Sequence, residues 1–316
     1  MKKSEYIANQ NLKLKEKISV EELNKLALDD IEEFILQCEE KYHKQIRELV
    51  EDFSSYNYKK IILLAGPTSS GKTTTSHLVR KELEKRGKKT VTISLDDFFL
   101  EYEKRPRLKD GTVDNESIDS IDVPYIESFT KELIETGKAN MPIYNFIKRA
   151  REPQTVEIKA DENTVIIFEG LHALNPKLFS DMTELSYRIF LSPNVDFYMD
   201  NKLVLQAKNL RLMRRCIRDT YSRGTMPETT LSMWKFITDC EEIYIKPYKY
   251  TADYIINSTH NYEPLVYAKY LKPLLEATEN NEMANDLIKI LNACEKVNKK
   301  FIPDNSMIWE FLVHKD

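Results

Sequence analysis

Glycine is scarce in this sequence of 316 residues, with only seven, and cysteine is scarcer still, with four. The cysteines (Cys38, Cys216, Cys240 and Cys294) show no C-x-x-C spacing, which argues against a zinc site or a disulfide framework and favours a reducing compartment. The first residues lack the apolar stretch of a signal peptide, and the apolar runs have the length of a strand, too short to cross a membrane. We therefore expect a cytoplasmic protein without a membrane partner.

Charge is close to balanced, with 47 basic and 51 acidic residues and a formal net charge of −4. Such a chain has no general attraction to nucleic acid or to an anionic membrane, so neither is expected as a partner. Hydrophobic residues make up 41% of the sequence, which suffices for a packed core. The length fits one large domain or two smaller ones.

Two of the few glycines define a phosphate-binding loop. Residues 66–73 read GPTSSGKT and match G-x-x-x-x-G-K-[ST] at every specified position. An apolar run at 61–65 precedes them and a helical pattern begins at Thr74, which is the strand–loop–helix context that the motif requires. In such a loop the backbone N–H groups surround phosphate oxygens, Lys72 reaches the outer phosphates and the Thr73 hydroxyl binds Mg²⁺. The chain is therefore predicted to bind a nucleoside triphosphate.

Strands and helices alternate after Lys59. The strand candidates are short, β-branched and continuously apolar, as in a buried parallel sheet. They are 61–65, 90–95, 164–168, 187–191 and 254–257. Helices are predicted at 72–86, 124–136 and 202–221. This order predicts an α/β fold of the P-loop NTPase class, with a doubly wound parallel sheet of about five strands between layers of helices.

Further helices are expected on both sides of this core. Residues 1–18 are polar and expected to be poorly ordered, and a capping box at 19–22 begins an amphipathic helix or helix pair that extends to about residue 53. Its apolar face is expected to pack on the core, with partner binding as the alternative. Residues 263–298 are predicted to form two more helices, and Pro303 opens a short tail.

Two of the predicted strands run into acidic residues at the edge where ligands of an open parallel sheet bind. Asp96 and Asp97 follow the strand at 90–95, and Glu169 follows the strand at 164–168. Beside a phosphate loop, such an acid helps to hold Mg²⁺. One of the two aspartates is expected to act as the base for a substrate hydroxyl, with capping of the next segment as the alternative.

Five arginines gather on one predicted helix and at its end. Guanidinium groups match phosphate oxygens and stabilise the charge of a phosphoryl group in transfer. The spacing of the first four is that of side chains along one helix face. We predict a lid over the phosphates; a solvated cationic face and a nucleic-acid patch are the alternatives. The residues are Arg211, Arg214, Arg215, Arg218 and Arg223, followed by Gly224.

The polar segments 101–123 and 139–160 are too long for simple connections and are expected to carry a substrate site. In the second segment Tyr144 and Phe146 precede basic residues that include Arg149, a combination that suits stacking on a flat base. A β-hairpin packed on the core explains the same pattern equally well.

Taken in order, these segments resemble the uridine kinase and phosphoribulokinase family of P-loop kinases from about residue 59 to residue 275. The similarity is specific because several separate motifs agree with the phosphate loop. They are 93–99 (ISLDDFF), 116–122 (ESIDSID), 142–146 (PIYNF), 168–171 (FEGL), 211–224 and 250–256 (YTADYII).

Residues 171–176 (LHALNP) and the tail at 303–311 are similar to a bacterial branch of nucleoside kinases. Members of this branch often carry an additional N-terminal regulatory domain, of which only the connecting helix is expected here. The resemblance implies an N-terminal helical extension at 1–55, a P-loop kinase domain at 56–275 and a C-terminal helical extension at 276–316.

The resemblance also implies roles for individual residues. Catalysis is assigned to Asp96 as the base, together with Lys72, Arg218 and Arg223. The residues predicted to bind ATP are Gly66, Pro67, Thr68, Ser69, Ser70, Gly71, Lys72, Thr73, Thr74, Arg214 and Arg218. Those predicted to bind the substrate are Asp96, Glu116, Tyr144, Phe146, Arg149, Arg215 and Glu169. The implied cofactor is Mg²⁺, with Thr73, Asp96 and Glu169 as its ligands.

Three positions depart from the family pattern. Glu116 stands where an aspartate is usual, Arg149 where a base-reading histidine is usual, and Thr225 where a second lid arginine is usual. Arginine only donates hydrogen bonds, so Arg149 favours carbonyl or ring-nitrogen acceptors on the base. Uracil fits this requirement, and the nucleobase is left open.

The resemblance implies a nucleoside kinase that uses ATP and Mg²⁺ to phosphorylate a 5′-hydroxyl, most readily of uridine and then of cytidine, in pyrimidine salvage. One alternative is a kinase of another hydroxyl substrate, such as a sugar phosphate or a pantothenate-like alcohol. Another is a regulatory module that binds ATP without turnover. A homo-oligomer is expected only because members of the family often form oligomers.

Overall fold

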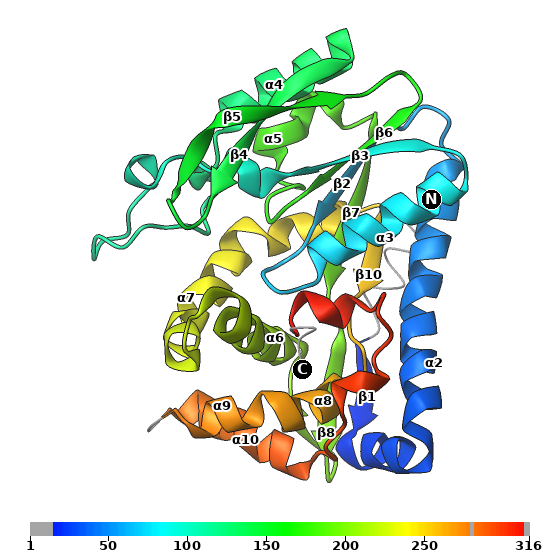
Figure 1. Ribbon diagram of the computed structural model, residues 1–316, viewed down its shortest axis with the longest axis vertical. Helices are drawn as coiled ribbons and strands as arrows, with labels where there is room; N and C mark the ends of the chain where they lie inside the picture. Colours follow the sequence, from blue (N-terminus) through cyan, green and yellow to red (C-terminus); the bar gives the residue numbers. More distant parts are fainter. Residues whose placement is uncertain (1–14, 279–280, 313–316) are drawn as a thin grey trace.

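The computed structural model describes residues 15–278 and 281–312. Its centre is a parallel, five-stranded sheet with the strand order β10-β7-β2-β6-β3 (Figure 1). The strands are short and mostly apolar, as in a sheet that is covered on both faces. They are β2 (Ile61–Ala65), β3 (Lys89–Ser94), β6 (Thr164–Glu169), β7 (Ser186–Ser192) and β10 (Tyr254–Asn257). The predicted α/β fold with about five parallel strands is confirmed.

Successive residues of β2 contribute to two different hydrophobic cores, because they point to opposite faces of the sheet. Ile62 and Leu64 belong to the core of one face, and Ile61 and Leu63 belong to the core of the other. The first face is covered by α2 (Val20–Ser54), α3 (Lys72–Lys85) and α6 (Ala207–Arg223), and the second by α4 (Val123–Thr136) and α5 (Pro176–Phe179). The sheet is therefore doubly wound, as predicted.

The long helix α2 runs along one side of the molecule (Figure 1). Asp30, with φ and ψ of −160° and 97°, divides it into two helices. The Asp30 carboxylate accepts the Glu33 N–H at 3.1 Å and so caps the second helix, just as the Ser19 hydroxyl accepts the Glu22 N–H at 3.0 Å and caps the first. The apolar face of α2 packs on the core as expected.

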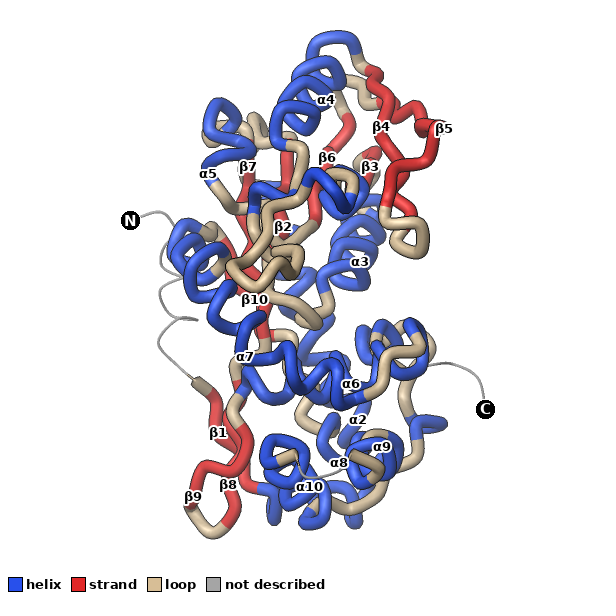
Figure 2. Tube along the Cα trace, turned by 90° about the vertical axis from the view of Figure 1, so that its left-hand side faces the viewer, coloured by secondary structure: helices blue, strands red, loops and turns tan. Residues whose placement is uncertain are grey.

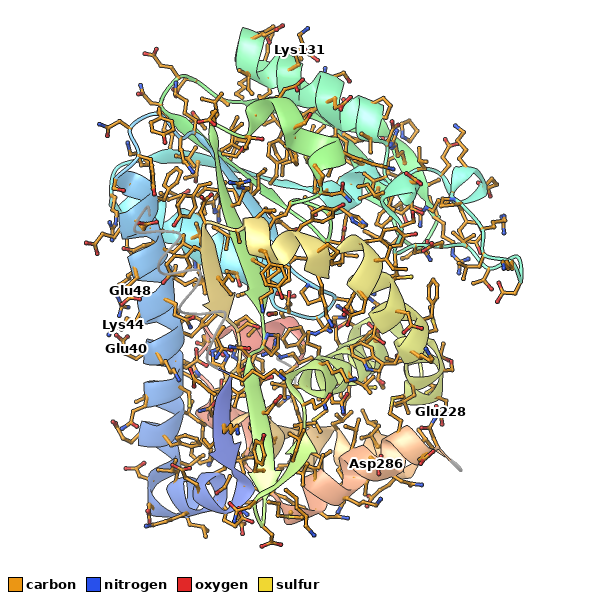
Figure 3. All side chains as sticks on the ribbon, turned by 180° about the vertical axis from the view of Figure 1, so that it is seen from behind. Glu40, Lys44, Glu48, Lys131, Glu228 and Asp286 are labelled. Carbon is orange, nitrogen blue, oxygen red and sulfur yellow. The ribbon has the colours of Figure 1, made fainter. Side chains whose placement is uncertain are left out.

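The opposite face of α2 is charged. Glu40, Lys44 and Glu48 lie one turn apart and project away from the body of the molecule (Figure 3). The Lys44 ammonium lies 3.9 Å from the Glu48 carboxylate, in the i,i+4 arrangement that gives a helix surface modest support. This face of α2 is therefore the solvent side.

A second, three-stranded sheet was not predicted. The prediction that residues 1–18 are poorly ordered is wrong for 16–18, while residues 1–14 lie outside the described part of the chain. The three strands are β1 (Glu16–Ser19), β8 (Val195–Met199) and β9 (Lys202–Leu205), in the order β1-β8-β9. The parallel pairing of β1 with β8 orders this N-terminal segment.

The predicted helix 202–221 is wrong at its start, because β9 occupies the first positions and α6 begins at Ala207. Asp200 and Asn201 adopt positive φ angles of 49° and 59° between β8 and β9. Aspartate and asparagine tolerate this conformation in tight hairpin turns, so the two residues reverse the chain before a helix can begin.

The hairpin of β4 (Lys138–Asn145) and β5 (Ala150–Lys159) lies with α4 at one end of the molecule, and the β1-β8-β9 sheet lies at the other end (Figure 2). Residues 263–298 form three helices where two were predicted, since Pro273 lacks the N–H that would continue the hydrogen-bond ladder of the first. These helices are α8 (Glu263–Tyr270), α9 (Lys272–Glu276) and α10 (Glu282–Ala293). Across the described ranges, no helix has both the length and the apolar character to cross a bilayer.

Candidate active site

The phosphate loop joins β2 to α3 at the carboxyl end of β2, and both glycines of the motif are required there, Gly66 by backbone crowding and Gly71 by its backbone conformation. A Cβ atom on Gly66 would lie 2.2 Å from the Leu191 carbonyl oxygen, and a Cβ atom on Gly71 would lie 2.4 Å from the Met307 sulfur. Gly71 also has a φ of 97°, which other residues rarely adopt. The N–H groups at the start of α3 are thereby presented at the end of the sheet, where an anion can bind.

Arg211 of α6 supports the phosphate loop through one of its backbone carbonyl groups. Its guanidinium group donates to the Thr68 carbonyl at 3.0 Å and forms two hydrogen bonds of 2.6 Å with the Glu241 carboxylate on α7 (Pro227–Tyr244). The same group lies 5.3 Å from the centre of the Trp234 ring. Because Arg211 and Glu241 are both buried, this ion pair joins α6, α7 and the loop into one unit.

Arg214 supports the same loop one helical turn later. It donates to the carbonyls of Ser69 and Ser70, both at 3.3 Å, and forms two hydrogen bonds of 2.7 Å with Glu263 at the start of α8. Both charged side chains are 0% exposed. Arg214 therefore shapes the loop through its backbone carbonyls, and its role in binding ATP stays a prediction.

The two aspartates after β3 have different surroundings. The Asp97 carboxylate accepts the N–H of Tyr144 on the hairpin at 3.2 Å, and burial raises the pKa of Asp97. Asp96 is exposed at the carboxyl end of the strand. Asp96 is therefore the aspartate that a ligand can reach, and Asp97 fastens the hairpin to the sheet.

Glu169 ends β6 next to β3. Its buried carboxylate accepts a hydrogen bond of 2.9 Å from the Ser94 hydroxyl. Burial, with the negative charge of Asp96 as the next cause, raises the pKa of Glu169 to about 7, and the positive charge of Lys72 opposes the rise. Two carboxylates that disfavour each other's charge form a place where a cation is favoured.

The side chains present fit a magnesium ion. Carboxylate and hydroxyl oxygens are ligands that Mg²⁺ prefers, and Thr73, Asp96 and Glu169 supply them beside the loop. In the described part of the chain, no group of three or more His, Cys, Asp and Glu side chains forms a metal cage. Mg²⁺ sites in enzymes that act on nucleotides commonly use one or two carboxylates together with phosphate oxygens and water, which is the set expected here.

The remaining lid arginines converge on one acid. The ion-pair distances from Arg215, Arg218 and Arg223 to the Asp219 carboxylate are 3.2, 2.8 and 3.6 Å. Gly224 follows in the left-handed conformation and ends α6, as predicted from its position. The five arginines therefore do not share one role: Arg211 and Arg214 bond to loop carbonyls, Arg215 donates to the Thr68 hydroxyl at 2.9 Å and also pairs with Asp219, and the last two pair with Asp219.

Glu116 lies in the segment that connects β3 with α4, and the fold brings it to the same region. It is half-buried, and burial raises its pKa to about 7, while the positive charges of Arg215 and Lys72 oppose the rise. These electrostatic effects require that Glu116 lies near both the phosphate loop and the lid. The structure therefore brings together residues from five separate sequence motifs: the phosphate loop and the segments 93–99, 116–122, 168–171 and 211–224.

The hairpin aromatics meet an arginine that the sequence analysis missed. Arg105 is buried, with its guanidinium carbon 4.3 Å from the centre of the Phe99 ring and 4.9 Å from that of Tyr144. It donates hydrogen bonds to the Tyr144 hydroxyl, to the Leu100 carbonyl at 2.8 Å and to the Asn115 amide oxygen at 2.6 Å. Nothing in the local sequence distinguishes Arg105 from other arginines of the same polar segment.

This packing changes the expectation for the base-stacking residues. Tyr144 is only 5% exposed and one side of its ring is covered by Arg105, whereas Phe146 is 59% exposed. Arg149 is exposed and lies 4.8 Å from the centre of the Tyr102 ring. Of the hairpin residues predicted to bind the base, Phe146 and Arg149 are therefore accessible, and Tyr144 is covered.

Comparisons with known proteins show which family this chain belongs to. The family model described as "Phosphoribulokinase / Uridine kinase family" matches residues 61–263. A uridine kinase of Mycoplasma genitalium is 26% identical over 197 residues, covering 62% of this chain and 84% of that protein, and one of Staphylococcus aureus is 28% identical over 205 residues, covering 62% and 86%.

A yeast uridine kinase, from Saccharomyces cerevisiae, is 28% identical over 235 residues, which is 73% of this chain and 43% of the relative. Among solved structures, phosphoribulokinase from Rhodobacter spheroides matches with a TM-score of 0.42 at 19% identity, over 62% of this chain and 68% of that one. Since the family model covers more than half of the sequence, the chain belongs to the phosphoribulokinase and uridine kinase family and is a phosphotransferase that acts on an alcohol group.

Proposed function

We propose that this protein is a nucleoside kinase that transfers the γ-phosphoryl group of ATP, with Mg²⁺, to the 5′-hydroxyl of a nucleoside, with uridine preferred and cytidine accepted. The observation that carries the proposal is the separation of the two aspartates. Asp97 is bound to the hairpin, and Asp96 stands exposed beside the phosphate loop and Glu169, where a base for a hydroxyl group is needed.

Each group then has a role in an in-line phosphoryl transfer. Asp96 accepts the proton of the attacking hydroxyl, and Lys72 and the loop N–H groups hold the phosphates. Arg218 and Arg223 exchange Asp219 for phosphate oxygens and stabilise the charge on the transferred group. Thr73, Asp96 and Glu169 would hold Mg²⁺, which would supply positive charge against the negative charge of the phosphates.

The acceptor is proposed to lie between the hairpin and the lid. Glu116, near Arg215, is placed to accept hydrogen bonds from ribose hydroxyls, and Arg215 would border the same sugar. Phe146 offers an exposed ring for stacking, and Arg149 offers N–H donors that suit carbonyl oxygens of a base. Catalysis of this kind depends on positioning and electrostatics, because the protein forms no covalent bond to the phosphoryl group.

The test is ADP release from ATP and Mg²⁺ in the presence of uridine, cytidine, adenosine, guanosine, thymidine, ribulose 5-phosphate or pantothenate. We expect turnover with uridine and with cytidine. Asp96→Asn should abolish turnover and keep ATP binding, measured by calorimetry, because the asparagine amide cannot accept the proton. The matched control is Asp239→Asn, which alters an exposed aspartate of α7 that pairs with Lys235. Unchanged turnover in Asp96→Asn would remove Asp96 from the role of base.

A kinase of an anionic hydroxyl substrate, such as a sugar phosphate, is the second candidate. Arg105 hydrogen bonds to a carbonyl, an amide and a phenol, all of them neutral, and Arg149 lies over the Tyr102 ring. Guanidinium groups among neutral partners favour an anionic group on the acceptor. Turnover with ribulose 5-phosphate and none with any nucleoside would select this candidate.

A further inference from the structure

A carboxylate from the C-terminal tail binds the phosphate loop. The tail returns across the molecule to α3, where its final 3-10 turn (Met307–Glu310) lies (Figure 1). The Glu310 carboxylate accepts the backbone N–H of Thr74 at 3.0 Å, although the two residues are 236 positions apart in the sequence. Glu310 is not among the residues that the sequence predicts for the site.

The Thr74 N–H is one of the donors that the phosphate-loop motif offers to a nucleotide. The first N–H groups of a helix have no acceptor within the helix, and in this motif they surround the phosphates. In α3 the Thr75 N–H already donates to the Gly71 carbonyl at 3.0 Å, so the Thr74 N–H is a donor that the loop leaves available. Glu310 therefore occupies, with a negative charge, a donor that a nucleotide phosphate would use.

The tail is firmly attached around this contact. Met307, Ile308 and Phe311 are at most 1% exposed and belong to the larger hydrophobic core. The Met307 sulfur packs against Gly71, and the Phe311 ring centre lies 5.0 Å from the Arg214 guanidinium carbon. The backbone of the tail is thus fixed by the core, whereas the Glu310 side chain is only half-buried.

We infer that Glu310 belongs to the ATP site, where it competes with the phosphates of ATP for the Thr74 N–H. This competition lowers the affinity of the protein for ATP. The inference rests on the proposed function, since it requires a nucleotide in the phosphate loop. Binding of ATP displaces the Glu310 side chain from the Thr74 N–H. The displaced carboxylate stays close to the phosphates, and the repulsion between the negative charges opposes ATP binding. Removing this charge should strengthen the binding of the donor.

The Glu310 carboxylate also adds negative charge at the start of α3, beside the region proposed to receive the phosphates and Mg²⁺. A neutral side chain at this position changes the donor side of the site and leaves the hairpin side unaltered.

The test compares Glu310→Gln and Glu310→Ala with the unaltered chain, using Mg²⁺–ADP and Mg²⁺–ATP in calorimetry and steady-state kinetics. The alanine variant should bind ADP about tenfold more tightly, the factor that corresponds to one competing charge-assisted hydrogen bond. The glutamine variant should show a smaller gain, because its amide oxygen still accepts the Thr74 N–H without a charge. The KM for the acceptor should stay constant in both.

Glu295→Gln, which alters an exposed glutamate ahead of the tail, is the matched control and should leave both constants unchanged. Thermal unfolding of each variant verifies that the tail is still folded. Equal or weaker ADP binding by Glu310→Ala would overturn the inference while leaving the kinase proposal intact. Absence of ADP and ATP binding in every variant, the unaltered chain included, would overturn both.

Discussion

Arg105 shows how one buried side chain organises the proposed acceptor region. Its guanidinium group links the segment after β3 to the hairpin through Asn115, Leu100 and the Tyr144 hydroxyl, and it packs against the neighbouring rings of Phe99 and Tyr144. A buried charged group is costly unless its N–H donors form hydrogen bonds, and three N–H donors of Arg105 do so here.

Arg105→Met should raise the KM for the nucleoside about tenfold or more and leave the KM for ATP unchanged, because it frees the Tyr144 ring without touching the phosphate loop. Steady-state kinetics with each substrate varied in turn measures the two constants. Arg107→Met is the control, since Arg107 is exposed in the same segment and donates to the Gly111 carbonyl. A parallel rise in both KM values would contradict a role confined to the acceptor.

Glu116 should make the stability of the protein depend on pH. Burial raises its pKa in the folded state to about 7, above the ordinary value of 4.5, so the folded state holds the proton more tightly than the unfolded state does. The contribution of Glu116 to the free energy of unfolding is therefore greatest below pH 4.5 and falls as the pH rises to about 7. Urea unfolding of Glu116→Gln should show a gain in stability over the unaltered chain at pH 8 and little or no gain at pH 5. An equal gain at both pH values would assign the effect to packing.

At the scale of elements, α6 acts as the support of the phosphate loop. Arg211 and Arg214 reach from this helix to three consecutive carbonyls of the loop and are held by carboxylates on α7 and α8. Since the guanidinium groups bond to carbonyl oxygens, the N–H groups of the loop are left for a ligand. The helix thus supports the proposed anion site through the loop carbonyls, while its second half supplies the remaining lid arginines.

Arg214→Met should lower the free energy of unfolding by about 3–5 kcal/mol, because it leaves the fully buried Glu263 carboxylate without its partner. The double variant Arg214→Met with Glu263→Gln should recover part of the loss, since no buried charge remains unpaired. Urea denaturation of both variants and of the unaltered chain measures these differences. A double variant that is less stable than the single one would show that Glu263 stabilises the fold independently of Arg214.

At the scale of the molecule, the larger hydrophobic core draws on all three predicted segments. It contains Phe34 and Leu49 of α2, Val79 of α3, and Met307 and Phe311 of the tail. The division at residues 55 and 275 stays a prediction about family organisation. Physically, the helical extensions cover one face of the central sheet, and a sheet face without its cover exposes apolar surface to water.

The fragment 56–275 should therefore fail to unfold cooperatively, although it contains the whole phosphate loop and lid. Deleting the flanking segments removes buried side chains from the core at a cost of about 1.5–3 kcal/mol each, which exceeds the stability of an ordinary domain after only a few residues. Circular dichroism during urea titration tests this, with the full chain as the control. A sharp transition in the fragment would show that the central segment folds without its extensions.

The sequence by itself determined the features that depend on neighbours along the chain. The glycine loop between an apolar strand and a helix, the acids at the ends of β3 and β6, and the five short buried strands all follow from local pattern and are found in the structure. The predicted start of α6 is wrong because the two-residue turn at 200–201 reverses the chain before the helix can begin. The predicted number of helices after residue 263 is wrong because Pro273 interrupts a segment whose apolar residues follow a helical spacing.

Only the tertiary structure decided which chemically equivalent side chains a ligand can reach. Arg214 and Arg218 lie one turn apart on α6, but Glu263, which holds Arg214, comes 49 residues later. Glu310 reaches Thr74 across most of the chain, and Arg105 meets Tyr144 through the fold of two separate segments. Burial and charge pairing depend on contacts between residues that are far apart in the sequence. Residue type and spacing therefore identify the candidate site residues, and packing against distant partners decides which of them a ligand can reach.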